Sequence, residues 1–235
     1  MANRIISFES IKSRAESRKG GVEALTRLLP PVHDKAALQS VTDDRFLAEM
    51  TKRVFCAGFA WNVIEAKWPG FEEAFLRFDP VDLIFQPDDY WDALTADKRI
   101  VRNGAKIMSV RHNAHFVHEI ADQYGSFGKF LSQWPSTDQI GLLDLLVKRG
   151  NRLGGNSGQM FLRFMGWDGF VTSKDVIACM RDAGLDIGEE AKSKSDMRKV
   201  QALFNHWVQE TGLSYTHISR ICALSIGADT GAGDH

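Results

Sequence analysis

The period of the apolar residues is the feature that most constrains the fold of this chain. Almost throughout its length they recur every three or four positions, as in the runs 46–55 and 197–207. This spacing places them along one face of an α-helix, whereas the alternation that is typical of a β-strand is nearly absent. The pattern therefore predicts an all-α fold.

Glycine and proline residues divide this pattern into about a dozen short helices, because both residues commonly end a helix. Ser136 with Gln139, and Thr172 with Asp175, have the spacing of capping boxes that begin a helix. A chain of 235 residues is long enough to bury a substantial core. We therefore predict a compact multi-helix bundle with two closely packed lobes.

The composition is that of an ordinary globular protein, with 44% hydrophobic and 25% charged residues. Because the net charge is −1, any contact with nucleic acid must come from a local patch. Three cysteines that are far apart in sequence, Cys56, Cys179 and Cys222, are typical of a reducing compartment. No apolar run has the length of a membrane span. We expect a cytoplasmic protein with no disulfide framework and no membrane partner.

The segment 142–166 joins two apolar helical runs through a glycine-rich break, which is the pattern of a helix-hairpin-helix. Glycines let the backbone turn tightly, and free N–H groups at the start of the second helix favour an anion. Lys148 and Arg149 add a local positive field. The alternative is an ordinary helix–helix corner. We expect a DNA phosphate to be bound by residues of the break, which are Arg152, Gly154, Gly155, Asn156, Ser157 and Gly158.

Three ordered blocks carry a resemblance to a known family. They are FCAGFAWNVIEAK at 55–67, FEEAFLRFDP at 71–80, and RIVRNGAKI at 99–107, followed by Asn113 and Ala114. In this order they resemble DNA-3-methyladenine glycosylase I, of the helix-hairpin-helix DNA glycosylase superfamily. The resemblance continues more loosely at 124–127 and 148–150, so that it extends over residues 43–185.

The resemblance implies an enzyme that removes N3-methyladenine from DNA by hydrolysing the bond between base and deoxyribose. The base must first leave the stack and enter a pocket. Trp61 matches the aromatic residue on which the family stacks the flipped base, and an indole face suits a cationic purine. Phe55 and Phe59 are further candidates for the pocket.

Two positions depart from the family. Its acidic base-recognition residue lies eight positions before the tryptophan, where this chain has Arg53, and a guanidinium would repel a cationic base. Glu49, one helical turn earlier, is a candidate to replace it, as is Glu65; the alternative is that both are surface carboxylates. We place Arg53 and Glu49 in the predicted base pocket.

The second departure concerns catalysis. Many members of the superfamily have a catalytic Asp where this chain has Ser173, so Asp175 is the candidate catalytic carboxylate. Its alternative role is the capping box with Thr172. Arg102, Asn103 and Lys106 belong to a matched block and are candidates for phosphate contacts, with a solvated helix start as the alternative.

Metal binding is not expected. His112, His115 and His118 recur along one side of a helix, but no second group of ligands at chelating spacing accompanies them. The zinc site of the family also has no counterpart among the cysteines and histidines of this chain. We expect neither a metal nor an organic cofactor.

These observations predict a helical extension over residues 1–40, a glycosylase-like domain over 41–227 and a flexible tail over 228–235. The expected partner is double-stranded DNA with a damaged base, and we expect a monomer without an obligate protein partner. Two other functions stay open. One is a non-catalytic protein of the same fold that binds damaged or structured DNA, and the other is a helical protein-interaction module.

Overall fold

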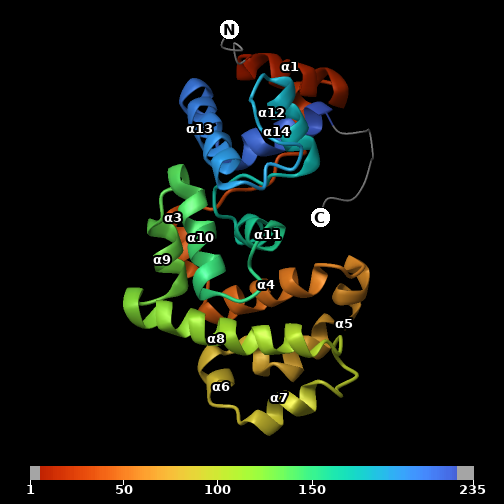
Figure 1. Ribbon diagram of the computed structural model, residues 1–235, viewed down its shortest axis with the longest axis vertical. Coiled ribbons are helices and arrows are strands. Elements are labelled where there is room, and N and C mark those ends of the chain that lie inside the picture. Colours follow the sequence, from red (N-terminus) through yellow and green to blue (C-terminus); the bar gives the residue numbers. More distant parts are fainter. Residues whose placement is uncertain (1–5, 227–235) are drawn as a thin grey trace. The chain divides into compact units, whose positions relative to one another are not determined.

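The computed structural model describes residues 6–226, and within them the chain forms fourteen α-helices, two short 3₁₀ helices and no strand (Figure 1). The predicted all-α fold is thereby confirmed. The predicted flexible tail at 228–235 lies outside the described residues. The helices form two compact units, of which unit 1 comprises residues 6–32, 136–140 and 168–226, and unit 2 comprises residues 33–135 and 141–167. The predicted extension 1–40 therefore contributes to both units.

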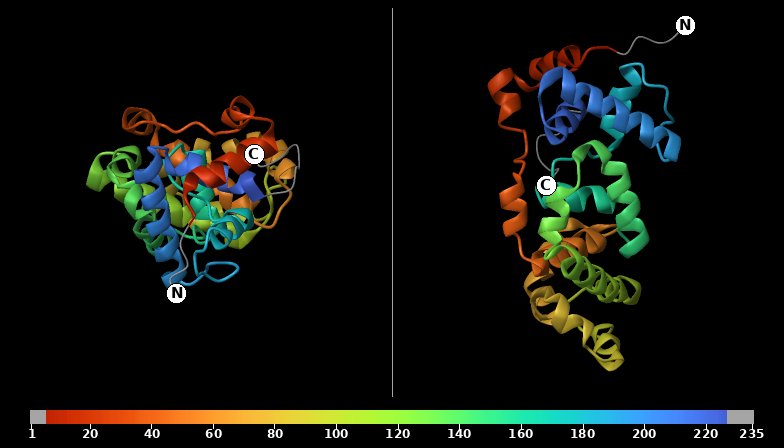
Figure 2. Two further views of the ribbon diagram at one scale, coloured as in Figure 1. Left: turned by 90° about the horizontal axis from the view of Figure 1, so that it is seen from above. Right: turned by 90° about the vertical axis from the view of Figure 1, so that its left-hand side faces the viewer.

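Unit 1 is built around its last helix, which packs against helices from both ends of the chain. Figure 2 shows α1 beside α14, although they are far apart in sequence. The core is aromatic, with Phe8 against Trp207 at 5.4 Å between ring centroids and Phe170 stacked on Phe204 at 4.3 Å. The helices of unit 1 are α1 (Phe8–Lys19), α2 (Val22–Thr26), α12 (Lys174–Asp182), α13 (Lys194–Thr211) and α14 (Tyr215–Ile226), with the 3₁₀ helix η2 (Ser136–Asp138).

Unit 2 is organised by its longest helix, α8 (Gly104–Tyr124), which packs against α4 (Asp43–Cys56), α6 (Pro80–Ile84) and α9 (Phe127–Gln133). The helix α4 also packs against α11 (Asn156–Phe164). Because α4 is apolar on several sides, it lies in the middle of the core. The remaining elements are α3 (Lys35–Ser40), α5 (Trp61–Ala74), η1 (Leu76–Phe78), α7 (Asp88–Leu94) and most of α10 (Gln139–Arg149).

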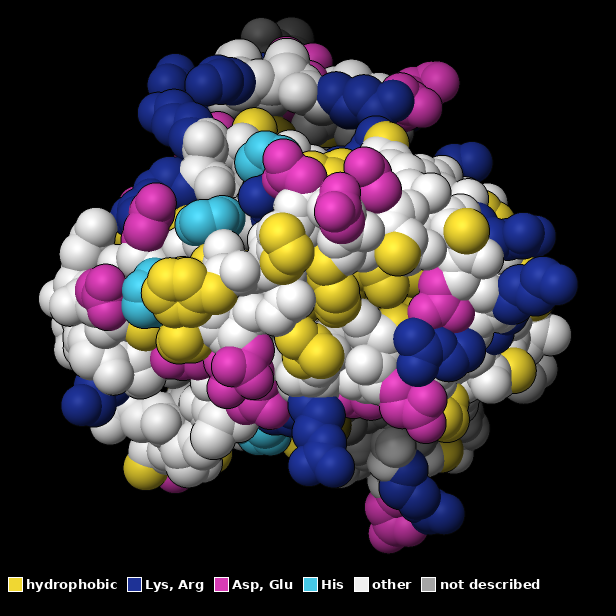
Figure 3. Space-filling model, turned by 90° about the horizontal axis from the view of Figure 1, so that it is seen from below, with side chains coloured by type: hydrophobic (Ala, Val, Ile, Leu, Met, Phe, Trp, Pro, Cys, Tyr) yellow, Lys and Arg dark blue, Asp and Glu magenta, His cyan; other side chains and the backbone are white. Residues whose placement is uncertain are grey.

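The surface of unit 2 near α6 carries exposed apolar side chains. Val81 is 45% exposed and Phe85 is 79% exposed. Figure 3, seen from below, shows hydrophobic side chains gathered near the middle of the visible face. Within residues 6–226, none of the helices combines the length and the hydropathy needed to cross a membrane.

Both predicted capping boxes are wrong. Gln139 is fully buried, and its side chain exchanges two hydrogen bonds with the backbone of Phe170, each of 2.7 Å, so it does not reach back to Ser136. The N-cap of α12 is Ser173, whose side chain accepts from the backbone N–H of Val176 at 3.3 Å. Asp175 therefore stands one position earlier in the helix than a capping box requires.

Replacing Gln139 by Leu should lower the free energy of unfolding by about 3 kcal/mol. The leucine would leave the buried N–H and C=O of Phe170 without partners, and each such group costs about 1–3 kcal/mol. Urea denaturation measures the effect, with Gln133→Leu as the control because Gln133 is exposed at the end of α9. Equal stability of the two variants would contradict this role for the Gln139 side chain.

Candidate nucleic-acid interface

An exposed aromatic segment joins α4 to α5 in unit 2. Phe59 is 41% exposed, Trp61 is 44% exposed and Val63 is 42% exposed. All six tryptophans lie in the described residues, and Trp61 alone is classed as exposed. A cluster of large apolar side chains held in water is typical of a surface that binds a partner or ligand.

Lys106 anchors this segment to the first turn of α8. Its side chain is buried, and its ammonium donates to the carbonyl oxygens of Phe55 at 3.2 Å and Ala57 at 2.5 Å. The same ammonium lies 4.6 Å from the ring centroid of Phe59, which is within the range of a cation–π interaction. The lysine thus caps the C-terminal carbonyls of α4 and positions the aromatic segment. Two of the three N–H donors of Lys106 are thus used within the protein, and its predicted phosphate contact stays a prediction.

The break between α10 and α11 lies close to this anchor. The Nε–H of Arg152 donates to the carbonyl of Ala105 at 3.3 Å. Burial lowers the pKa of Lys106, and the nearby positive charge of Arg152 lowers it further. Within residues 6–226, neither cation forms an ion pair with a carboxylate. Two neighbouring positive charges are therefore left without a compensating anion between the aromatic segment and the break.

The backbone of the break explains its glycines. Gly155 has φ +57° and is the N-cap of α11, where it offers no side-chain acceptor to the first N–H groups of the helix. A Cβ on Gly158 would lie 2.4 Å from the carbonyl oxygen of Leu153, so glycine is needed there for the backbone of the break to lie against α11. Arg152 itself has φ +60°, which is uncommon outside glycine.

Asn113 fixes the break to α8. Its fully buried side chain accepts from the backbone N–H of Asn151 at 2.7 Å and donates to the carbonyl of Asn151 at 3.1 Å. A reciprocal pair of this kind satisfies both backbone groups of a residue that is outside any helix. The break is therefore held at two points on α8, by Asn113 and by the carbonyl of Ala105.

The predicted recognition residues form a buried charged pair. Arg53 is 6% exposed, and its Nε lies 2.7 Å from Oε1 of Glu49, one turn earlier on α4. The guanidinium also lies 4.0 Å from the ring centroid of Phe164 in α11. Burial raises the pKa of Glu49, while the charges of Arg53 and Lys52 oppose the shift. Glu65 pairs with Lys52 instead. Glu49 is thus not a free surface carboxylate, and its charge offsets that of Arg53.

The remaining predicted residues are distributed as follows. Phe55 is fully buried, with its ring edge-on to Phe71 at 4.8 Å, and belongs to the core. Asn103 is the N-cap of α8 and accepts from the N–H of Lys106 at 3.1 Å. Asp175 is exposed in the first turn of α12 and lies in unit 1, whereas the aromatic segment and the break lie in unit 2.

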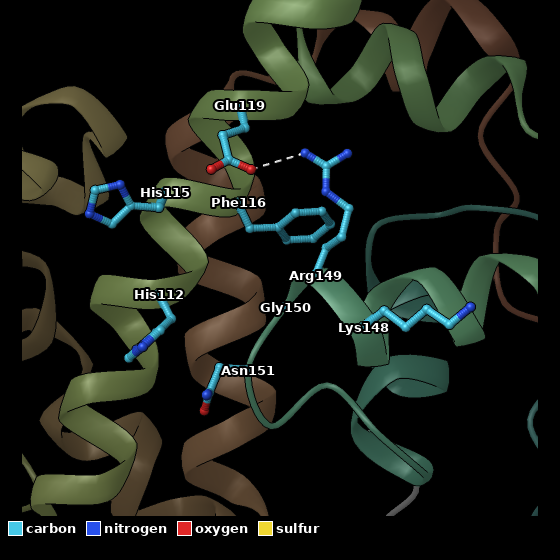
Figure 4. Close-up of a pocket in the computed structure, with 8 residues that line it drawn as sticks. All are labelled: His112, His115, Phe116, Glu119, Lys148, Arg149, Gly150 and Asn151. Carbon is cyan, nitrogen blue, oxygen red and sulfur yellow. Dashed lines mark hydrogen bonds and ion pairs between the residues drawn. The ribbon is translucent and has the colours of Figure 1, made fainter.

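A depression of about 530 Å³ borders the break on the side of α8 (Figure 4). Its charged side chains do not converge, since Arg149 turns toward Glu119, at 3.0 Å, and Lys148 points away from His115. His112 bonds through Nδ1 to the carbonyl of Met108. Among the described residues, no three His, Cys, Asp or Glu side chains are grouped as metal ligands would be.

Of three residues that build this interface, sequence reasoning selects Lys106 for a different role and does not select Asn113 or Phe164 as site residues. Lys106, Asn113 and Phe164 act through contacts with residues roughly 40–110 positions away, and no short motif encodes such contacts. One sequence signal indicates that Lys106 and Asn113 matter for the site: Lys106 lies in the block 99–107, which resembles the family, and Asn113 follows this block.

The helical architecture is found in a solved DNA glycosylase. The 8-oxoguanine glycosylase/lyase of Methanocaldococcus jannaschii, in a crystal structure with a 15mer DNA containing 8-oxoguanine, aligns over 91% of this chain and 95% of its own with a TM-score of 0.51 and 10% identity. The likeness shows the fold. The 3-methyladenine DNA glycosylase I of Staphylococcus aureus aligns over 58% of this chain and 79% of its own, with a TM-score of 0.45 and 26% identity.

Residues 26–142 match the model of the methyladenine glycosylase family. This match confirms, over the residues that it covers, the resemblance drawn from the three sequence blocks. The match begins earlier than the resemblance did and ends at residue 142. It includes the aromatic segment, Lys106 and the Glu49–Arg53 pair, whereas the break after α10 and the position of Asp175 lie beyond it.

The Glu49–Arg53 pair should show strong energetic coupling. Glu49→Gln should lower the free energy of unfolding by about 2 kcal/mol, because it leaves a buried guanidinium uncompensated. In the Glu49→Gln variant, the further substitution Arg53→Met should lower the free energy of unfolding by much less than it does in the unmodified protein. The double-mutant cycle should therefore give a coupling energy of about 1–2 kcal/mol. Urea denaturation of the four proteins measures it.

The matched control is Glu23–Arg27, which has the same spacing but is 91% and 77% exposed at its two side chains. Its coupling energy should be below about 0.5 kcal/mol. If the effects of the two substitutions on the free energy of unfolding were additive, this would contradict an interaction between the charges of Glu49 and Arg53 inside α4.

Proposed function

We propose that this protein is a DNA glycosylase that hydrolyses the N-glycosidic bond of a damaged purine after base flipping. The damaged base is an alkylated purine such as N3-methyladenine, and the substrate is double-stranded DNA. The observation that carries the proposal is the link from the exposed aromatic segment, through Lys106, to Arg152 in the break between α10 and α11. This link brings a surface for a base and a surface for a phosphate into one unit.

The DNA backbone is proposed to lie along the break. Lys106 and Arg152 supply positive charge without a carboxylate partner. The helix α11 begins at the end of the break, and its first N–H groups receive no hydrogen bond from a capping side chain. Contacts of this kind hold DNA irrespective of its sequence. The segment 142–166 would then act as a helix-hairpin-helix, in which the exposed Gly155 leaves room for a DNA strand, whereas the buried Gly158 makes room for Leu153.

The base is proposed to stack on Trp61, with Phe59 beside it. Stacking on an aromatic side chain contributes about 1–3 kcal/mol per base, and a cationic base gains further from the indole face. Because Glu49 balances the charge of Arg53, the buried pair does not present a net positive charge to such a base. An alkylated purine is already positively charged, so its glycosidic bond is weakened and binding supplies much of the remaining acceleration.

We propose Asp175 as the carboxylate that activates the attacking water. The proposal is based on its position in the sequence, two residues after Ser173. It is exposed at the start of α12, with Ser173 as the N-cap of that helix.

Three free cysteines support a cytoplasmic location, and we propose a monomer.

A second candidate function is a non-catalytic protein that binds DNA damage. It is favoured by one observation, which is that the carboxylate of Glu49 is engaged by Arg53 and so is not free to act on a substrate. The two functions differ in a single property, the release of a free base.

Trp61→Ala should reduce base release from methylated duplex DNA by about 5- to 150-fold, the equivalent of losing about 1–3 kcal/mol of stacking. Chromatography of the released bases measures both the rate and the identity of the product. Phe85→Ala is the matched control, because Phe85 is an exposed aromatic residue outside the segment. Lesion binding without any release by the unmodified protein would favour the second function, and an undiminished rate in Trp61→Ala would remove that residue from the pocket.

A further inference from the structure

One side of the helix α6 is left uncovered within unit 2. Among the large hydrophobic side chains that are exposed in the described residues, Phe85 has the highest exposed fraction, 79%. Val81 lies four positions earlier, and the backbone of Phe85 continues the helical conformation, so the two share one side of α6. The other side of the helix packs inward, since Pro80 and Leu83 are buried. A pair of apolar side chains held in water in this way is typical of a surface that binds a partner.

The segment 79–97, which contains both α6 and α7, is strongly acidic. Of the 30 acidic residues in the chain, six are in this segment, whereas all 29 basic residues lie outside it. The net charge of −1 therefore conceals one purely acidic segment in a chain that is otherwise basic. Its charged residues are Asp79, Asp82, Asp88, Asp89, Asp92 and Asp97. We call the exposed surface of this segment the acidic face.

Most of these carboxylates have no cation beside them. Two of the six are paired, one with Arg111 and one with Arg99. Within residues 6–226 no ion pair involves the other four, of which Asp82, Asp89 and Asp92 are exposed on α6 and α7. The fourth caps the start of α6. The negative charge of the acidic face is therefore open to a cation from outside the chain.

The apolar and the acidic side chains belong to one surface of unit 2. The helices α6 and α7 follow each other in sequence, and both pack against α8. Phe85 ends α6 only three positions before Asp88, the first residue of α7. Figure 3 views the molecule from the end at which Figure 1 draws α6 and α7, and it shows hydrophobic side chains with Asp and Glu side chains beside them.

The charge of the acidic face decides which kind of partner fits it. DNA and anionic lipid head groups carry phosphate charges, which unpaired carboxylates repel. A positively charged protein segment is attracted instead, and an apolar side chain on that segment gains by removing the Phe85 ring from water. We propose that the acidic face is a docking site for a basic segment of another protein that carries apolar side chains.

The partner segment is defined by its chemistry. Its apolar side chains pack on Val81 and Phe85, and its lysines or arginines on either side lie near Asp82 on α6 and Asp92 on α7. The aromatic contact supplies most of the affinity, while the exposed charges set the orientation and the rate of association. The proposal does not rest on the proposed glycosylase activity, because no residue of the aromatic segment or of the break belongs to the acidic face.

Fluorescence anisotropy with the folded full chain and two synthetic peptides tests the proposal. Both peptides carry leucines on one helical face, flanked by lysines in the first peptide and by glutamates in the second. We expect only the lysine peptide to bind. Phe85→Ser should weaken its binding about tenfold or more, because the buried ring is lost. Val22→Ser is the control and should leave binding unchanged, because it removes a side chain of unit 1 that is 60% exposed.

A reversal of charge on the acidic face tests the electrostatic part of the proposal. Asp82→Lys combined with Asp92→Lys changes one exposed carboxylate on each helix and leaves the cap of α6 in place. This double variant should lose the lysine peptide and bind the glutamate peptide. Affinity of the unmodified protein for the lysine peptide should fall as salt rises, because exposed charges are screened. The proposal is overturned if the unmodified protein binds both peptides equally well.

Hydrogen exchange with mass spectrometry locates the bound peptide. We expect amides at 80–93 to become protected when the lysine peptide is added. Protection at 57–63 instead, or unchanged affinity in Phe85→Ser, would contradict a docking site at the acidic face. Self-association of the unmodified chain that is lost in Phe85→Ser would also overturn the proposal, because a second copy of the chain would then cover this face.

Discussion

The buried ammonium of Lys106 is the interaction on which the interface depends. It satisfies the last carbonyls of α4, lies against the ring of Phe59 and stands beside Arg152. Burying a charge without a counter-ion is costly, so its hydrogen bonds to two carbonyl oxygens are needed to offset that cost. In return the first turn of α8 holds both the aromatic segment and the break after α10. Two neighbouring positive charges thus stand together here in a chain whose net charge is −1.

The helical fold and the position of the glycine break could be predicted from sequence, because both depend on local rules. The period of apolar residues predicts helices, and Gly155 and Gly158 occur where φ is positive or a Cβ would strike Leu153. The exposure of Trp61 was also consistent with its predicted role. These features need only a few neighbouring residues to be recognised.

The residues that misled the sequence analysis are those with long-range partners. Gln139 looked like part of a capping box, yet Phe170 takes both of its hydrogen bonds. Lys106 looked like a phosphate ligand, yet two of its three donors are used by Phe55 and Ala57. Arg53 was expected to repel a cationic base, but Glu49 and Phe164 give it a counter-charge and an aromatic ring inside the protein. In this chain the guanidinium at this position is therefore balanced by contacts inside unit 2.

The central claim is that one surface of unit 2 contacts a DNA strand through both the aromatic segment and the break. Hydrogen exchange with mass spectrometry on the full chain, with and without a duplex that carries a stable analogue of a flipped nucleotide, tests it directly. The account predicts that amides at 57–61 and at 150–157 become protected together when the duplex is added. Protection of only one of these segments, or of neither while the duplex is bound, would contradict it.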